Sequence, residues 1–213
     1  MPAPYPAPRT RRALAAALLL GVAACGHGGP PASSTSPTLP ASITKLDAGV
    51  LRIARARFCD LVPEAAVRAA LGSAPASSTD WRDGDPVPGT PATQSAHELG
   101  CGWAGADGTT ARAWVFARPV SVSFAHDIAV AGGTENGCRL VAGPAFGRPT
   151  MTQVCTLAGS VVRVRHAGLF GDSWLTCETS GPAGRSGADR TAAVKQRADA
   201  WCVAVAGVLD TAR

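Results

Sequence analysis

The sequence predicts a single, disulfide-stapled α+β domain, in which helices pack on an antiparallel sheet. Three observations predict this class. Apolar and polar residues alternate over 160–165, as they do in antiparallel strands that have one solvated face. Residues 189–209 instead carry apolar side chains at helical spacing. Six cysteines lie between positions 59 and 202, and such numbers are typical of exported domains that are cross-linked by disulfides.

The first half of the domain predicts one helix and one hairpin. A short helix is expected over 63–72, because this segment has proline in its first turn and glycine at its end. Residues 73–100 are rich in Pro, Ser, Thr and Gly and are expected to form a long loop. Strands 101–104 and 110–117 flank an Asp-Gly pair, which predicts a hairpin turn between them.

The second half predicts most of the sheet and the longest helix. A short helix is expected over 123–130, followed by strands over 151–157, 160–167 and 173–179. The final helix, 189–209, has an apolar stripe with a spacing of 3.6 residues. Its members are Val194, Ala198, Trp201, Cys202, Val205 and Leu209.

Residues 1–24 predict a lipoprotein signal peptide. Three arginines at positions 9, 11 and 12 precede an apolar run of 12 residues over 13–24. As a helix this run spans only about 18 Å, less than the roughly 30 Å of a bilayer core. Its Val-Ala-Ala-Cys ending resembles the bacterial lipobox, which implies cleavage before Cys25 and attachment of a diacylglycerol, with acyl chains such as palmitate, to its sulfur as a thioether. We therefore expect a lipid anchor on the extracytoplasmic side of the cell membrane, reached by Sec or twin-arginine export.

Residues 25–46 are expected to tether the folded domain, 47–212, to the membrane, because they are rich in Pro, Ser, Gly and Thr. Cleavage removes three arginines and no acidic residue, which lowers the formal net charge from +5 to +2. This charge gives no electrostatic basis for binding nucleic acid. The expected partners are the membrane, through the lipid, and an unidentified ligand or protein of the envelope.

The cysteines predict three disulfides. Of the seven in the chain, Cys25 takes the lipid, which leaves six in an oxidising compartment. A weak internal repeat aligns Cys-Asp-Leu-Val at position 59 with Cys-Arg-Leu-Val at 138, and Cys-Gly-Trp-Ala-Gly at 101 with Cys-Thr-Leu-Ala-Gly at 155. If this repeat is real, it selects one of the 15 possible pairings. The selected pairs are Cys59–Cys101, Cys138–Cys155 and Cys177–Cys202.

Residues 59–105 resemble a family of actinobacterial cell-envelope lipoproteins of unknown function. The resemblance consists of Cys-x-Leu-Val, a short helix that ends Ala-Leu-Gly, and Cys-x-Trp at the start of a hairpin. A weaker resemblance is to the extracellular sensor domains of mycobacterial serine/threonine kinases, which are also disulfide-linked α+β units. Both resemblances imply an envelope domain, and neither implies a reaction or a catalytic residue.

Gly171-Asp172-Ser173 resembles the nucleophile block of a family of small secreted esterases and lipases. In that family the block lies near the start of the domain, and an Asp-x-x-His block follows much later. Here all four histidines precede Ser173, and none has aspartate three positions before it. A serine without a base is a weak nucleophile. We expect a turn at 171–172 and a strand that starts at Ser173; a hydrolase that uses Ser173 is the alternative.

One pattern predicts a binding surface. The strands 110–118 and 160–166 each carry arginine or aromatic residues at every second position, and the side chains at such positions share one face. If the two faces adjoin, they form an arginine-rimmed groove with an aromatic floor, suited to an acidic or sugar-like ligand. The alternative is that the aromatic residues are core and the arginines are solvated. The residues concerned are Arg112, Trp114, Phe116, Arg163 and Arg165.

Metal and cofactor signatures are missing from the sequence. His97-Glu98 lies close to Cys101, which the disulfides require, and no second cluster of ligands exists. We therefore expect no metal, no cofactor and no catalytic residue. The leading hypothesis is a lipid-anchored, non-enzymatic binding or sensing module.

Overall fold

The computed structural model describes residues 42–86, 94–182 and 187–212, and the side chains of 187–190 are excepted. The chain divides into two units, 1–36 and 37–213, and every described residue lies in the second. The signal peptide, Cys25 and most of the tether therefore lie outside the described residues. No helix among the described residues has both the length and the apolar composition needed to cross a membrane.

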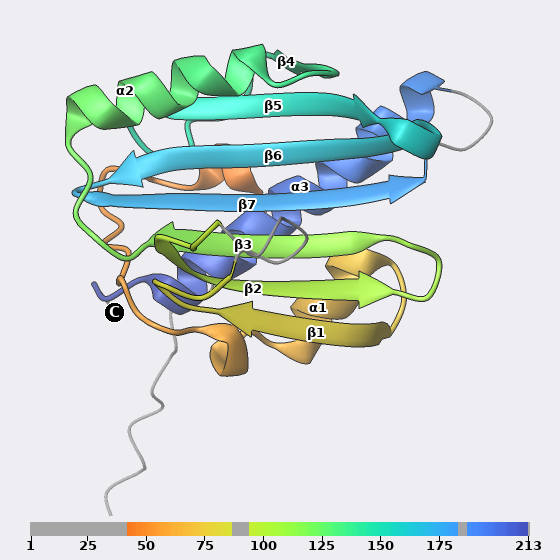
Figure 1. Cartoon of the computed structure of the whole chain (residues 1–213), viewed down its shortest axis with the longest axis horizontal. Coiled ribbons are helices and arrows are strands. Elements are labelled where there is room, and N and C mark those ends of the chain that lie inside the picture. The colour runs from red at the N-terminus through yellow and green to blue at the C-terminus, as the bar shows by residue number, and fades with distance from the viewer. Residues whose placement is uncertain (1–41, 87–93, 183–186, 213) are drawn as a thin grey trace, which may run out of the picture. The chain divides into compact units, whose positions relative to one another are not determined.

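Seven strands form one antiparallel sheet, in the order β1-β2-β3-β7-β6-β5-β4 (Figure 1). The central pair, β3 and β7, joins the hairpin β2–β3 to the hairpin β6–β7. This sheet, with the helices packed on it, confirms the predicted α+β class. The strands are β1 Pro75–Trp81, β2 Glu98–Gly105, β3 Thr110–Phe116, β4 Cys138–Leu140, β5 Thr150–Leu157, β6 Val161–Phe170 and β7 Ser173–Pro182.

Three α-helices cover the sheet unequally. The helices α1 (Glu64–Leu71) and α3 (Gly187–Leu209) lie behind the sheet in Figure 1, whereas α2 (Val122–Ala131) packs on the opposite face near β5 and β6.

We call the face of the sheet that is turned away from α3 the open face. On β3, β6 and β7 it carries Arg112, Trp114, Phe116, Arg163, Arg165, Trp174, Thr176 and Glu178. Short 3₁₀ helices complete the fold: η1 Ile43–Lys45, η2 Cys59–Leu61, η3 Gly132–Thr134 and η4 Ala158–Ser160.

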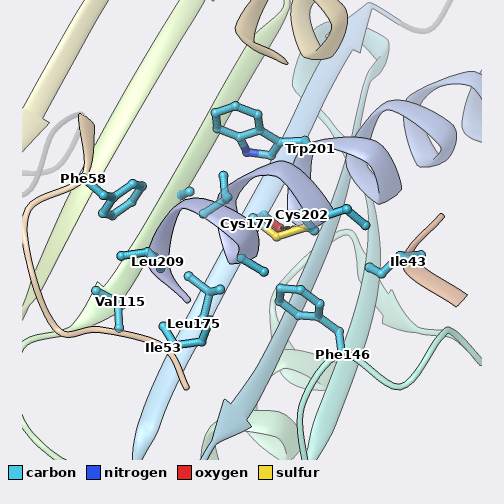
Figure 2. Close-up of a cluster of buried hydrophobic side chains, with 14 of the residues drawn as sticks. Ile43, Ile53, Phe58, Val115, Phe146, Leu175, Cys177, Trp201, Cys202 and Leu209 are labelled. Carbon is cyan, nitrogen blue, oxygen red and sulfur yellow. Dashed lines mark hydrogen bonds between the residues drawn. A yellow bond between two sulfur atoms is a disulfide. The ribbon is translucent and has the colours of Figure 1, made fainter. Parts of the chain in front are cut away.

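The main core lies between the sheet and α3. All six residues of the predicted apolar stripe on α3 are at most 3% exposed. The Cys177–Cys202 disulfide lies in this cluster and bonds β7 to α3 (Figure 2). Trp201 packs edge-on against Trp103, with the ring centroids 5.4 Å apart, and its Nε1 donates to the Arg112 carbonyl at 2.9 Å. The core therefore uses aromatic and disulfide contacts to hold the longest helix on the sheet.

The three predicted disulfides are confirmed as Cys59–Cys101, Cys138–Cys155 and Cys177–Cys202. One of the two aligned pairs of motifs nevertheless adopts different structures. The first begins the 3₁₀ helix η2, whereas its counterpart at position 138 forms the strand β4. In the other pair, Cys101 and Cys155 both lie in strands, so the aligned motifs share a backbone conformation only in part.

Two predicted boundaries are wrong. Residues 73–100 were expected to be a loop, but β1 lies within them and pairs with β2 along the edge of the sheet. Of its seven side chains only Trp81 is buried, so no apolar alternation marks the strand. Residues 42–46 were expected to be tether, but Ile43 and Leu46 are buried in the main core. The folded domain therefore begins before position 47.

Candidate binding site on the open face of the sheet

The structure places all five predicted groove residues on the open face. On β3 the intervening residues Ala111, Ala113 and Val115 are fully buried on the side of α3, and this alternation turns Arg112, Trp114 and Phe116 the other way. On β6, buried Val162 and Val164 have the same effect on Arg163 and Arg165. The two groups do not adjoin directly, because β7 lies between β3 and β6.

Glu178 occupies the position on β7 between the two groups. It is the register partner of Arg112 on one side and of Arg165 on the other. Its carboxylate lies 2.7 Å from Arg165 Nε, 3.7 Å from Arg163 Nε and 3.8 Å from Arg112 Nη1. The Glu178 side chain is only 4% exposed, so three guanidinium groups converge on one buried carboxylate.

A second carboxylate, Glu135, follows η3 and reaches the same cluster. It accepts from Arg163 Nη2 at 2.5 Å, Gln153 Nε2 at 3.1 Å and Arg165 Nη1 at 3.4 Å. Burial raises the pKa of Glu135, but the hydrogen bond from Arg163 and the charges of Arg165 and Arg163 outweigh it, so that the pKa lies below its ordinary value. Glu135 is therefore ionised at neutral pH, and the arginines face two negative charges.

Tryptophan and arginine side chains stack across the sheet. The Arg112 guanidinium lies 5.2 Å from the ring centroid of Trp81 and 5.6 Å from that of Trp114, and Arg165 lies 5.4 Å from the Trp114 centroid. Trp81 lies directly over Gly100, where a Cβ atom would come within 2.1 Å of the indole. No helix covers this part of the open face, and the arginine side chains cover its aromatic rings instead.

The sequence left two arrangements open: an arginine-rimmed groove with an aromatic floor, or aromatic residues in the core with solvated arginines. Neither describes this surface fully. Trp114 and Phe116 are half-buried rather than core. The arginines are not solvated ends, because the side chains of Arg163 and Arg165 are only 13% and 18% exposed. The surface is a packed network of paired charges and aromatic rings.

Two neighbouring cavities open beside this network. The smaller, of about 250 Å³, lies between the sheet and α2 and is lined by apolar, aromatic and charged side chains that include Trp114, Phe116, Ile128, Glu135, Arg165 and Thr176. The larger, of about 500 Å³, is lined by residues that include His97, Phe116, Arg118, Val120 and Phe124. Phe116 lines both. Walls of this kind, mostly apolar with a few polar groups, are typical of sites for small molecules.

Ser173 lies away from these cavities, at the start of β7. Gly171 has a φ of +66°, and residues 171–172 form the turn between β6 and β7, which confirms the predicted turn. The Ser173 hydroxyl is buried, donates to the Ile53 carbonyl at 2.8 Å and accepts from Arg55 Nη1 at 3.1 Å. Asp172 pairs with the same guanidinium. Each of these partners belongs to the segment before α1, so the serine fixes that segment to the sheet.

The buried histidine, His166, belongs to a separate network on the side of α3. Its Nδ1 lies 3.0 Å from Thr152 Oγ1, and its Nε2 lies 2.8 Å from Asp199 Oδ1. Lys195 pairs with the same carboxylate. Burial raises the pKa of Asp199, but hydrogen bonds from His166 and Lys195 outweigh this effect and hold the pKa below its ordinary value. The network connects α3 to β5 and β6.

One cluster among the described residues has the spacing of metal ligands. The donor atoms of Glu135, Cys138 and Cys155 lie within 4.8 Å of one another. Both sulfurs are bonded to each other, which leaves the carboxylate alone as a ligand.

Compared with known proteins, the chain matches no family model and no curated protein.

Glu178, Glu135 and Trp81 complete the site, and sequence reasoning missed them. Glu178 could have been found only from the strand register, because its three arginine partners lie 13, 15 and 66 positions before it.

Proposed function

We propose that this chain is a cell-envelope lipoprotein whose domain is a non-enzymatic binding or sensing module, and that the smaller cavity, between the sheet and α2, binds a sugar-like ligand. One observation carries the binding proposal. Trp114, Phe116 and Arg165 line the smaller cavity, and Arg112 and Arg163 pair with the same carboxylate as Arg165. The resemblance to envelope lipoproteins and to kinase sensor domains supports the location and the class.

The charge balance favours a neutral, hydroxyl-rich ligand over a strongly acidic one. Glu178 and Glu135 offset all but one of the three arginine charges. The paired groups still offer both N–H donors and carboxylate acceptors, and a sugar hydroxyl can donate and accept at once. Trp114 and Phe116 supply the apolar surface on which the C–H face of a sugar ring packs. The hydrolase alternative has no comparable support, because the Ser173 hydroxyl is buried and doubly hydrogen-bonded.

Binding should be detectable by calorimetry on the mature chain, with N-acetylglucosamine oligomers and glucuronate as probes. We expect the neutral sugar to bind more tightly than the acidic one, because the arginines are already paired. Trp114→Leu should weaken this binding about tenfold or more, since a lost aromatic contact is worth about 1.5 kcal/mol. Arg57→Gln is the matched control, because Arg57 pairs with Asp80 away from the cavity. Equal affinities in Trp114→Leu and the unaltered chain would place any sugar site elsewhere.

Replacement of Cys25 by serine should move the protein from the membrane fraction to the soluble fraction of a bacterial host. The reason is that two or more acyl chains anchor a protein stably, whereas a polar tether does not. Cell fractionation and the mass of the mature N-terminus measure the change. Retention in the membrane with unchanged processing would contradict the lipid anchor and leave the proposed sugar site unaffected.

A further inference from the structure

The Cys138–Cys155 disulfide lies at the edge of the sheet. Its two cysteines are direct register partners on β4 and β5, and β4 has only three residues. Cys138 is half-buried, whereas Cys155 is fully buried. An incoming reagent can therefore approach the sulfur of Cys138 but not that of Cys155.

A positive charge lies beside these sulfurs. Arg163, the register partner of Cys155 on β6, places its Nη2 3.0 Å from Cys155 Sγ and 3.5 Å from Cys138 Sγ. The Glu135 carboxylate binds this guanidinium and itself lies within 4.8 Å of both sulfurs. The guanidinium is the nearer group, and Arg165 offsets part of the Glu135 charge. Arginine next to a cysteine stabilises the thiolate, which is the reactive form in disulfide exchange.

The polar neighbours of the other two disulfides are different. Cys59 Sγ lies 3.4 Å from the Gly100 carbonyl oxygen. Cys177 Sγ lies 3.8 Å from the His166 carbonyl oxygen, and Cys202 Sγ lies 3.7 Å from that of Cys177. A carbonyl oxygen is itself an acceptor and repels a thiolate, whereas a guanidinium attracts one. Cys177 and Cys202 are also fully buried.

We propose that Cys138–Cys155 is a thiol–disulfide exchange site, which accepts two electrons from an external dithiol, and that Arg163 assists by stabilising the Cys155 thiolate. One thiolate of the dithiol attacks Cys138 Sγ and forms a mixed disulfide. The Cys138–Cys155 bond breaks, and its electron pair passes to Cys155 Sγ beside Arg163. The second thiolate of the dithiol then attacks the dithiol sulfur that is bonded to Cys138, and this releases the Cys138 thiol. The dithiol is oxidised to a disulfide, and its two protons pass to Cys138 and to solvent.

The proposal predicts an order of reduction in the folded, full mature chain. Samples are equilibrated with increasing dithiothreitol at pH 7, alkylated, and mapped by mass spectrometry. Cys138 and Cys155 should become labelled at a reductant concentration at which the other four cysteines of the domain remain bonded. Earlier or simultaneous labelling of Cys59 and Cys101 would overturn the proposal, because each of the two pairs has one half-buried and one fully buried cysteine, and the contact with Arg163 is the feature proposed to favour Cys138–Cys155.

Charge variants test the role of Arg163. Arg163→Gln should raise the dithiothreitol midpoint for Cys138–Cys155 about tenfold, while Arg163→Lys should retain most of the effect. Glu135→Gln should shift the midpoint in the opposite direction, since it removes a negative charge near the sulfurs. Arg68→Gln is the control, because Arg68 pairs with Glu64 on the exposed surface of α1 and its replacement so removes a guanidinium that lies away from β4 and β5. Equal midpoints in Arg163→Gln and the unaltered chain would refute the assistance by Arg163. If Arg163→Gln does not fold, the shift in Glu135→Gln decides the question.

Discussion

Replacement of Glu178 by alanine is expected to lower the free energy of unfolding by about 3 kcal/mol or more. Glu178 is almost fully buried, and three arginines converge on its carboxylate. Removal of one partner from a buried ionic cluster leaves the remaining charges uncompensated, which costs about 3–5 kcal/mol. We take the lower end of this range because Arg112 is 33% exposed and Arg163 and Arg165 keep Glu135.

Urea unfolding of the oxidised domain, followed by tryptophan fluorescence, measures this loss. Glu64→Ala is the control, because Glu64 forms an exposed pair with Arg68 one helical turn away. Such pairs contribute about 0.3–0.5 kcal/mol. If the two substitutions reduced stability equally, the open-face network would be a surface feature rather than part of the packed structure. Circular dichroism should confirm that each variant is folded before unfolding is compared.

Removal of the Cys177–Cys202 disulfide by a double substitution to alanine is expected to have the other large effect. The bond closes a segment of 25 residues, and the chain-entropy model assigns about 3.5 kcal/mol to a loop of this length. Both cysteines are fully buried between β7 and α3, so the lost sulfur packing adds to this figure. The total should exceed the effect of the same double substitution at Cys138 and Cys155.

The comparison between the two disulfides separates entropy from packing. The Cys138–Cys155 loop has a separation of 17 residues, for which the same model gives about 3.1 kcal/mol. Loop length therefore predicts nearly equal losses, whereas burial predicts a larger loss for Cys177–Cys202. Equal unfolding midpoints for the two double variants would show that the sulfurs in the core contribute little beyond the cross-link.

The sequence predicted the elements that carry a periodic apolar pattern. The α3 stripe, the alternation of β3 and β6 and the hairpin turn before β3 are local signals, and each was confirmed. The strand β1 gave no such signal, because its side chains are polar and its stability comes from backbone pairing with β2. The three residues of β4 are likewise too few to form a pattern.

The site was predictable only in part for a related reason. Alternation placed Arg112 and Arg165 each on one face of its own strand, but the strand order decides what lies between them. The insertion of β7 between β3 and β6 brought in Glu178, which no local pattern identifies. Trp81 was assigned to a loop, and its position over Gly100 depends on the pairing of β1 with β2. Long-range pairing thus brought Glu178 and Trp81 to the surface, while local periodicity placed the arginines, Trp114 and Phe116 on it.

The position of β7 also has a consequence for how the chain folds. The strands β1–β3 and the strands β4–β7 are each consecutive in the sequence, and β3 meets β7 across a separation of 70 residues at Thr110 and Ser180. Among the described residues, Cys59–Cys101 lies in the half that contains β1–β3, and Cys138–Cys155 and Cys177–Cys202 lie in the half that contains β4–β7 and α3. Oxidation can therefore be completed in each half before the halves dock, and docking is the step of highest contact order, the kind that slows folding most. In a chain that is oxidised before the halves dock, the edges of β3 and β7 would be unpaired, and unpaired strand edges are the sites at which chains aggregate.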